Sequence, residues 1–259
     1  MHFKTNAFAH RAARVAHLAR GASLLAVTAM ALVPQTMRAQ KDPLVLDDFS
    51  TGKGKAESAT GTKYYAQTGT GIVGGTRNIN LIMGPGDSAS VFAQPVQVQV
   101  RPQPKDSATP SALIVSAGFQ AYGTVQVYYD GSATESVDLN LVPYDRFRVT
   151  FAGLIGTVDF AFEVADIAGN LSAVTCFIGP FSGTNIDGSG FTITTVDIPQ
   201  ASLISPGTVD WSNIKLISMQ LGSASAYGLS NFAITDLSAI MATDPAGTVT
   251  CPPGGTSGQ

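Results

Sequence analysis

The chain has 259 residues, of which 44% are hydrophobic and only 13% charged, against about 25% charged in ordinary soluble domains. All three histidines lie within the first 39 residues, a basic stretch that contains no acidic side chain. Beyond it, ten basic and eighteen acidic side chains remain, a net charge of −8 with no histidine. An acidic body of this kind is unsuited to binding nucleic acid, and it excludes catalysis by a histidine base.

Residues 1–39 have the pattern of a helical signal peptide. A basic stretch precedes a 13-residue apolar run at 21–33, and a polar segment then ends in Met37-Arg38-Ala39. Thirteen helical residues make about 20 Å, short of the ~30 Å hydrocarbon core of a bilayer. We therefore predict cleavage after Ala39, no membrane span in the mature chain, and secretion to the periplasm, the cell surface or the medium.

Period-two alternation of apolar and polar residues dominates the chain after residue 43. It is clearest at 96–101, 147–151 and 158–164, and such alternation is typical of strands with one buried face. Nine other segments are predicted strands: 44–49, 71–83, 112–116, 124–129, 137–141, 174–178, 191–198, 214–221 and 229–237. Within 214–221 the alternation changes phase at Leu216-Ile217, which predicts a β-bulge or a strand buried on both faces.

The absence of helical periodicity after the leader indicates an all-β fold. About a dozen short strands without intervening helices favour a two-sheet antiparallel sandwich of jelly-roll type over a barrel or a propeller. We expect one sandwich domain at 40–243 and a flexible C-terminal tail at 244–259, rich in Gly, Pro and Thr. Residues 51–63 and 101–110 are predicted loops.

The chain has two cysteines, Cys176 in a predicted strand and Cys251 in the predicted tail. In an oxidising compartment they are expected to form a disulfide, which would pin the tail onto the sandwich. Two free thiols are the alternative. The closed loop of 75 residues would contribute about 4 kcal/mol in the chain-entropy model.

Carboxylates are the catalytic groups that remain without histidine. Glycoside hydrolysis needs two of them across a cleft, and Glu163 lies with Asp159 on the polar face of a predicted strand. Alternation by itself predicts solvated charges at these positions. No catalytic motif is present, so we predict a non-catalytic protein and keep a polysaccharide-active enzyme as an alternative.

Calcium is the metal that these side chains would suit, since oxygen ligands are plentiful. One candidate site combines Asp47 and Asp48 of the first strand with Asp236 of the last, by analogy with jelly-roll carbohydrate-binding modules. A second combines Asn185 and Asp187 in a short loop. Capping of turns and protection of sheet edges are the structural alternatives for these residues.

Exposed aromatic side chains are the usual platforms for sugar rings in a sandwich. Tyr128 and Tyr129 are consecutive, so one must point outward from a regular strand. The sole tryptophan, Trp211, precedes an apolar strand, which favours a core position. The candidates for a ligand-binding face are Tyr128, Tyr129, Tyr144, Tyr227 and Trp211, with Tyr122 in addition.

Four short motifs carry a family resemblance: GIVGGTRNI at 71–79, VYYDG at 127–131, YDRFRV at 144–149 and VDWSNI at 209–214. Their order resembles that of secreted bacterial β-sandwich proteins that often carry a PEP-CTERM sorting tail. The resemblance implies an extracellular sandwich associated with the surface or the matrix. No Pro-Glu-Pro motif follows Ile240, so free secretion is expected in place of sorting by such a tail.

These observations predict a secreted, non-catalytic β-sandwich that acts as an extracellular binding or structural protein. Its expected partners are glycans or components of the cell surface or matrix. A calcium-stabilised carbohydrate-binding module and a carboxylate-dependent polysaccharide enzyme are the alternatives.

Overall fold

The fold is described from a computed structural model of the chain. The described residues are 42–58, 61–83, 96–104, 107, 109–117, 123–131, 137–155, 157–178, 193–204, 208–222 and 231–251. The chain divides into two compact units, Met1–Lys41 and Asp42–Gln259, and the described residues all belong to the second. The predicted signal peptide at 1–39 therefore lies outside the described residues.

The second unit consists of strands joined by turns. In chain order they are β1 (Leu44–Asp47), β2 (Gly54–Ser58), β3 (Thr62–Thr68), β4 (Thr76–Met83), β5 (Val96–Arg101), β6 (Ala112–Ser116), β7 (Gly123–Tyr129), β8 (Arg146–Ile155), β9 (Val158–Asp166), β10 (Leu171–Ile178), β11 (Thr194–Pro199), β12 (Ile214–Leu221), β13 (Asn231–Ile240) and β14 (Val249–Thr250). Two short 3-10 helices accompany them, η1 (Val73–Gly75) and η2 (Gln200–Ser202). No helix in the described part of the chain is long and apolar enough to cross a membrane.

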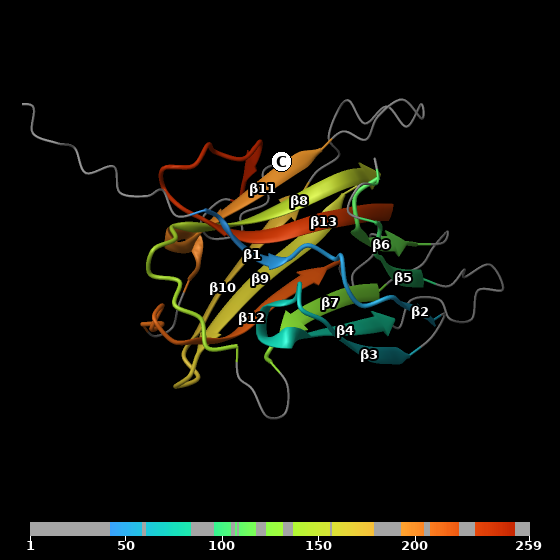
Figure 1. The fold of residues 1–259 in the computed structure, drawn as a ribbon, viewed down its shortest axis with the longest axis horizontal. Coiled ribbons are helices and arrows are strands. Elements are labelled where there is room, and N and C mark those ends of the chain that lie inside the picture. Colours follow the sequence, from blue (N-terminus) through green and yellow to red (C-terminus); the bar gives the residue numbers. More distant parts are fainter. Residues whose placement is uncertain are drawn as a thin grey trace, which may run out of the picture. The chain divides into compact units, whose positions relative to one another are not determined.

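The strands form two sheets. In the described residues, the eight-stranded sheet has the order β14-β11-β8-β13-β6-β5-β2, with β1 also paired to β13, and the six-stranded sheet has the order β10-β9-β12-β7-β4-β3. Figure 1 shows β11, β8 and β13 side by side in one sheet, and β7, β4 and β3 in the other. The chain changes sheet repeatedly, from β6 to β7, from β7 to β8 and from β8 to β9. Pairing is antiparallel except between β11 and β14, so the predicted jelly-roll sandwich is confirmed.

Alternate residues of both sheets fill the core. On β9, Val158, Phe160, Phe162 and Val164 are buried, as the alternation predicts. Phe162 meets Phe147 of β8 with ring centroids 4.6 Å apart, joining the two sheets. Each such large apolar side chain contributes about 1.5–3 kcal/mol when it leaves water.

A buried polar network also crosses the sandwich. Arg77 of β4 is fully buried and donates from Nη1 to both carboxylate oxygens of Asp47 in β1, at 2.7 and 2.5 Å. Its Nε and Nη2 donate to Gln67 of β3, and its guanidinium lies 5.0 Å from the ring centroid of Phe49. The Tyr129 hydroxyl donates to Asp47 Oδ2 at 2.9 Å. Burial, and then the Asp47 carboxylate, raise the pKa of Tyr129 well above its usual value.

The structure differs from the sequence prediction at both edges of the sandwich. Residues 51–63 are predicted as a loop, yet they contain β2 and the start of β3. These strands are held by cross-strand partners: β2 pairs with β5, and β3 pairs with β4 along its whole length. Glycine and lysine are uncommon in strands, so the sequence of these segments does not indicate a strand. Their strand conformation depends on pairing with other segments of the chain. Conversely, the predicted strand at 137–141 makes a single bridge, between Leu139 and Ile214.

The irregularity predicted at Leu216-Ile217 is present as a β-bulge. The register of β12 against β9 shifts between Ile214 and Leu216, and the Leu216 side chain is half-buried on the outer face.

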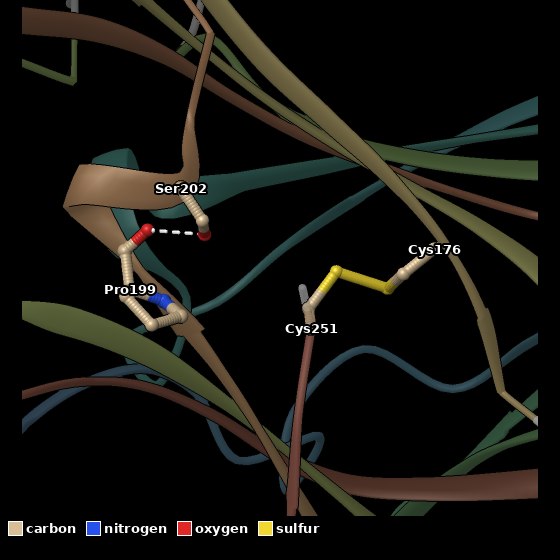
Figure 2. Close-up of a disulfide and its surroundings, with 4 residues drawn as sticks. All are labelled: Cys176, Pro199, Ser202 and Cys251. Atoms are coloured by element: carbon tan, nitrogen blue, oxygen red, sulfur yellow. Dashed lines mark hydrogen bonds between the residues drawn. A yellow bond between two sulfur atoms is a disulfide. The ribbon is translucent and has the colours of Figure 1, made fainter. Parts of the chain in front are cut away.

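Cys176 and Cys251 form the predicted disulfide, which links β10 of the six-stranded sheet to the end of β14 (Figure 2). Nearby, the Ser202 hydroxyl of η2 donates to the Pro199 carbonyl. The segment that ends at Cys251 thus joins β11 of the eight-stranded sheet through β14 and is tied to the six-stranded sheet through the disulfide. Residues 252–259 lie outside the described residues.

Candidate functional site

The outer face of the six-stranded sheet carries two rows of polar side chains that run across the strands. Side chains paired in register point to the same face, so the pairing places them next to one another. The first row is Glu163 of β9, Ser218 of β12, Tyr128 of β7 and Asn78 of β4. The second row is Ala161, Gln220, Gln126, Asn80 and, on the edge strand β3, Tyr64.

The two rows border a hollow of about 420 Å³ on this face. Its lining residues are Asn80, Gln126, Tyr128, Asp130, Glu163, Leu216 and Ser218. Six of them come from the neighbouring strands β4, β7, β9 and β12, and Asp130 directly follows β7. The volume lies in the range of small-ligand sites, which span about 300–1,000 Å³.

Two tyrosines lie at the β3 side of this hollow. Tyr64 is 58% exposed, and its hydroxyl donates to Asn78 Oδ1 at 2.6 Å. Asn78 in turn donates from Nδ2 to Asp130 Oδ1 at 2.7 Å. Burial is the main cause that raises the pKa of Tyr128, with Tyr64 and Asp130 adding to it. The side chains therefore form a fixed chain of hydrogen bonds that holds two aromatic rings at the surface.

The remaining lining residues offer hydrogen-bond donors and acceptors to a ligand. Asn80 Nδ2 donates to Gln126 Oε1 at 3.3 Å, which orients both carboxamides. The other carboxamide donors and acceptors, with the Ser218 hydroxyl, match the mixed donor and acceptor character of polyol hydroxyls. Glu163 has no hydrogen-bond or ion-pair partner among the described residues. The hollow thus combines aromatic surface with polar groups that can form hydrogen bonds to a ligand.

The structure distributes the predicted aromatic candidates differently from the expected binding face. Tyr128 points into the hollow, whereas Tyr129 is fully buried beside Asp47 and Tyr144 is 4% exposed. Trp211 packs against the core, with its ring centroid 6.4 Å from that of Phe147. Tyr129 and Tyr144 are therefore core residues, and Trp211 is a partly buried residue at the edge of the core. Tyr227 and Tyr122 lie outside the described residues.

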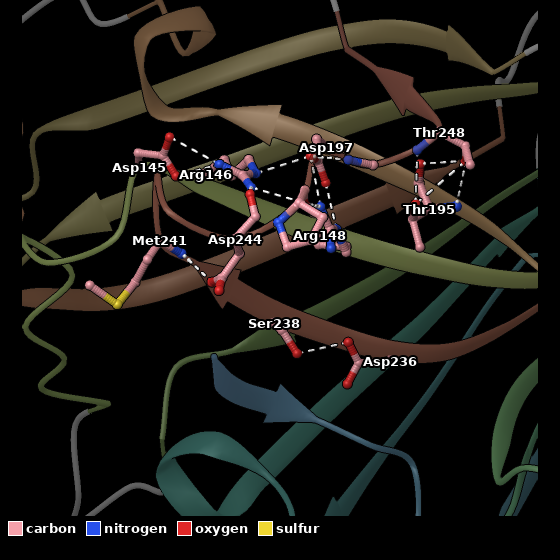
Figure 3. Close-up of polar contacts among 12 residues, drawn as sticks. Asp145, Arg146, Arg148, Thr195, Asp197, Asp236, Ser238, Met241, Asp244 and Thr248 are labelled. Carbon is pink, nitrogen blue, oxygen red and sulfur yellow. Dashed lines mark hydrogen bonds and ion pairs between the residues drawn. The ribbon is translucent and has the colours of Figure 1, made fainter. Parts of the chain in front are cut away.

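Each of the three aspartates of the first calcium candidate has a protein partner. The Arg77 guanidinium, a permanent cation, already neutralises Asp47. Asp48 Oδ1 accepts from the Ser50 amide, and Asp236 Oδ2 accepts from the Ser238 hydroxyl, a contact shown in Figure 3. Burial, then Asp48 and Asp47, raise the pKa of Asp236.

Across the described ranges, no three His, Cys, Asp or Glu side chains are grouped so that they could hold a metal ion. The second candidate, Asn185 with Asp187, lies outside those ranges. Calcium binding at Asp47, Asp48 and Asp236 stays a prediction.

Several residues of the site are not among those predicted from the sequence: Tyr64, Asn78, Asn80 and Gln126. Asn78 and Asn80 alternate with buried Ile79 and Leu81, and Gln126 alternates with Val125 and Val127. That alternation predicts that Asn78, Asn80 and Gln126 lie on the outer face. Tyr64 carried no such signal, because β3 has polar residues on both faces.

Comparison with known proteins yields similarities of fold only. No family model matches the chain, and no curated protein matches it. One similar solved structure is the family 11 carbohydrate-binding module of the cellulosomal cellulase Lic26A-Cel5E of Clostridium thermocellum, at 14% identity over 79% of this chain and 97% of that one, with a TM-score of 0.39. Another is PfGH50B, at 9% identity over 80% of this chain and 24% of that one, with a TM-score of 0.36. Similarities of this size carry no information on ligand or activity, and the PEP-CTERM resemblance rests on its four motifs alone.

Proposed function

We propose that the protein is a secreted, non-catalytic module that binds glycans on the outer face of its six-stranded sheet. The observation that carries this proposal is the hollow beside Tyr64 and Tyr128, where hydrogen-bonding side chains line an aromatic platform. Aromatic rings stack against the apolar faces of sugar rings, while carboxamides and hydroxyls fix the orientation of sugar hydroxyls.

The rows suit an extended ligand that crosses the strands. Neighbouring strands lie about 4.8 Å apart, so five strands from β9 to β3 offer a path of roughly 19 Å. A path of this length can contact several consecutive sugar units. The rigid sheet positions these groups before binding, which lowers the entropic cost of association.

Secretion is supported by the leader pattern at 1–39 and by the disulfide between Cys176 and Cys251. Disulfides persist in oxidising compartments outside the cytoplasm. The histidine-free mature chain supports a non-catalytic role, since the commonest general base is missing.

Affinity electrophoresis in native gels tests the proposal. The gels contain hydroxyethyl cellulose, arabinoxylan, galactomannan or laminarin, and we expect retardation of the wild type by at least one of them. Tyr64→Ala and Tyr128→Ala should reduce that retardation. Phe177→Ala is the matched control, since Phe177 is an aromatic of the same sheet, 43% exposed, that does not line the hollow. Retardation that is absent in all gels, or equal in all variants, would contradict the proposal.

A carboxylate-dependent enzyme is the second candidate function, because Asp130 and Glu163 both line the hollow. It requires release of reducing sugar from one of these polymers, and loss of that release in Glu163→Gln. Binding without release supports the non-catalytic role.

A further inference from the structure

The hollow on the six-stranded sheet is acidic. Asp130 and Glu163 are its charged lining residues, and none of the seven lining residues is basic. The other five are uncharged. A ligand in this hollow therefore meets two carboxyl groups and no compensating cation from the lining.

The two described lysines on this sheet do not compensate this charge. Lys63 pairs in register with buried Leu81, so its side chain lies on the opposite face of β3 from that of Tyr64. Lys215 lies in the bulge of β12, and its Nζ approaches the turn at Gly169, at the end of the sheet.

The two carboxyl groups differ in how they are used. Asp130 accepts a hydrogen bond from Asn78 and so helps to position Asn78, which accepts the hydrogen bond of the Tyr64 hydroxyl. The Glu163 side chain has no hydrogen-bond or ion-pair partner among the described residues. Its strand, β9, is paired on both sides, with β10 and with β12. A carboxylate held in this way accepts hydrogen bonds from ligand hydroxyls and repels ligand carboxylates.

We propose that Glu163 and Asp130 determine the charge class of the ligand: the hollow accepts neutral polysaccharides and rejects those that carry carboxylate or sulfate groups. This inference rests on the proposed glycan-binding function and specifies its substrate class. A like-charge contact at short range is a means of rejecting the wrong partner while the uncharged contacts supply affinity.

Matched pairs of polymers test the inference. Hydroxyethyl cellulose is compared with carboxymethyl cellulose, and neutral arabinoxylan with glucuronoxylan, at about 10 mM ionic strength, where charges interact over roughly 30 Å. We expect the wild type to bind the anionic member of a pair at least about tenfold more weakly than the neutral member. Raising the salt to 0.5 M should narrow this difference.

Two variants assign the discrimination to the hollow. Glu163→Gln, and Glu163→Gln combined with Asp130→Asn, should raise the ratio of anionic-polymer binding to neutral-polymer binding by about threefold to tenfold. The matched control is Asp159→Asn. It removes one negative charge from the same strand outside the lining, so it reproduces any effect of the net charge alone.

The outcomes separate the two proposals. If the wild type binds an anionic polymer as well as its neutral counterpart, the charge inference is wrong and glycan binding stands. The inference also fails if Asp159→Asn gains as much as Glu163→Gln, because overall repulsion then explains the selectivity. If no polymer of either class is bound, the proposed function fails, and the inference fails with it.

Discussion

On the outer faces of both sheets, polar side chains alternate along the strands with buried apolar ones. The two faces differ in the partners of these polar side chains. On the eight-stranded sheet, Arg146 and Arg148 of β8 lie beside Asp197 of β11 (Figure 3). Arg148 Nε is 2.7 Å from Asp197 Oδ1, and Arg146 Nε is 3.0 Å from Oδ2. Hydrogen bonding to Asp197 raises the pKa of Arg148. On the six-stranded sheet, none of the described residues that line the hollow beside Glu163 is basic.

A covering segment accounts for the difference. Both arginines donate to the Pro245 carbonyl, and the Gly247 amide donates to Asp197 Oδ2 at 2.6 Å. Residues 244–248 thus lie over β8 and β11 and are held by the polar groups of these strands, while β14 joins the edge of the sheet. The polar side chains that line the hollow of the six-stranded sheet belong to the proposed glycan-binding face. Changes on the first face should therefore alter stability, and changes on the second should alter binding.

The largest effect is expected from the disulfide that fastens the covering segment. Cys176→Ala combined with Cys251→Ala should lower the free energy of unfolding by about 4 kcal/mol, because a 75-residue loop is no longer closed in the unfolded chain. Urea denaturation of the variant and of the oxidised wild type measures the loss. Wild type reduced with dithiothreitol should behave like the variant. An unchanged midpoint would show that the disulfide contributes nothing.

Next in size is the charge that the covering segment caps. Asp197→Asn leaves two largely buried arginines without their carboxylate and should cost about 3 kcal/mol. Glu163→Gln on the other face should change stability by less than about 0.5 kcal/mol, since no pairing is lost. Equal losses in the two variants, measured by urea denaturation, would remove the distinction between the faces.

A smaller effect should appear in binding alone. Tyr64→Phe keeps the ring and removes the 2.6 Å hydrogen bond to Asn78, so the platform loses its fixed orientation. We expect about threefold weaker binding of whichever neutral polymer retards the wild type, and a stability loss of about 0.5–1 kcal/mol. Isothermal titration gives the affinity, and Phe177→Ala serves as control. Full affinity in Tyr64→Phe would show that the hydroxyl has no part in positioning.

The smallest effect is a pH dependence at the end of the six-stranded sheet. Hydrogen bonds from the Asp210 amide and from Asn170 lower the pKa of Asp166 from 3.8 to about 2. Its folded-state pKa lies below the unfolded one, so its stabilisation is complete above about pH 4 and is lost as pH falls toward 2.

Thermal unfolding between pH 5 and pH 2 should therefore show a smaller decline in melting temperature for Asp166→Asn than for the wild type. Glu163→Gln is the control and should follow the wild type. A variant curve parallel to that of the wild type would contradict the assignment to Asp166.

Part of the site was predictable from local pattern. Buried Val125 and Val127 place Tyr129 inward and Tyr128 outward, a phase that follows from period two along β7. The same rule placed Glu163 on the polar face of β9. Tyr64 could not be found in this way, because β3 is an edge strand whose exposure depends on its pairing with β4.

Alternation and composition predict which side of each regular strand is buried and the all-β class, and the cysteine count leaves one possible disulfide. Each of these depends on neighbours along the chain or on a count of residues. Which strands pair is settled only in the folded chain. The pairing brings Glu163 and Tyr128, 35 positions apart, into one row, and it brings residues 244–248 against β8 and β11. The physical reason is that alternation specifies the side of a strand but carries no information on its partner across the sheet.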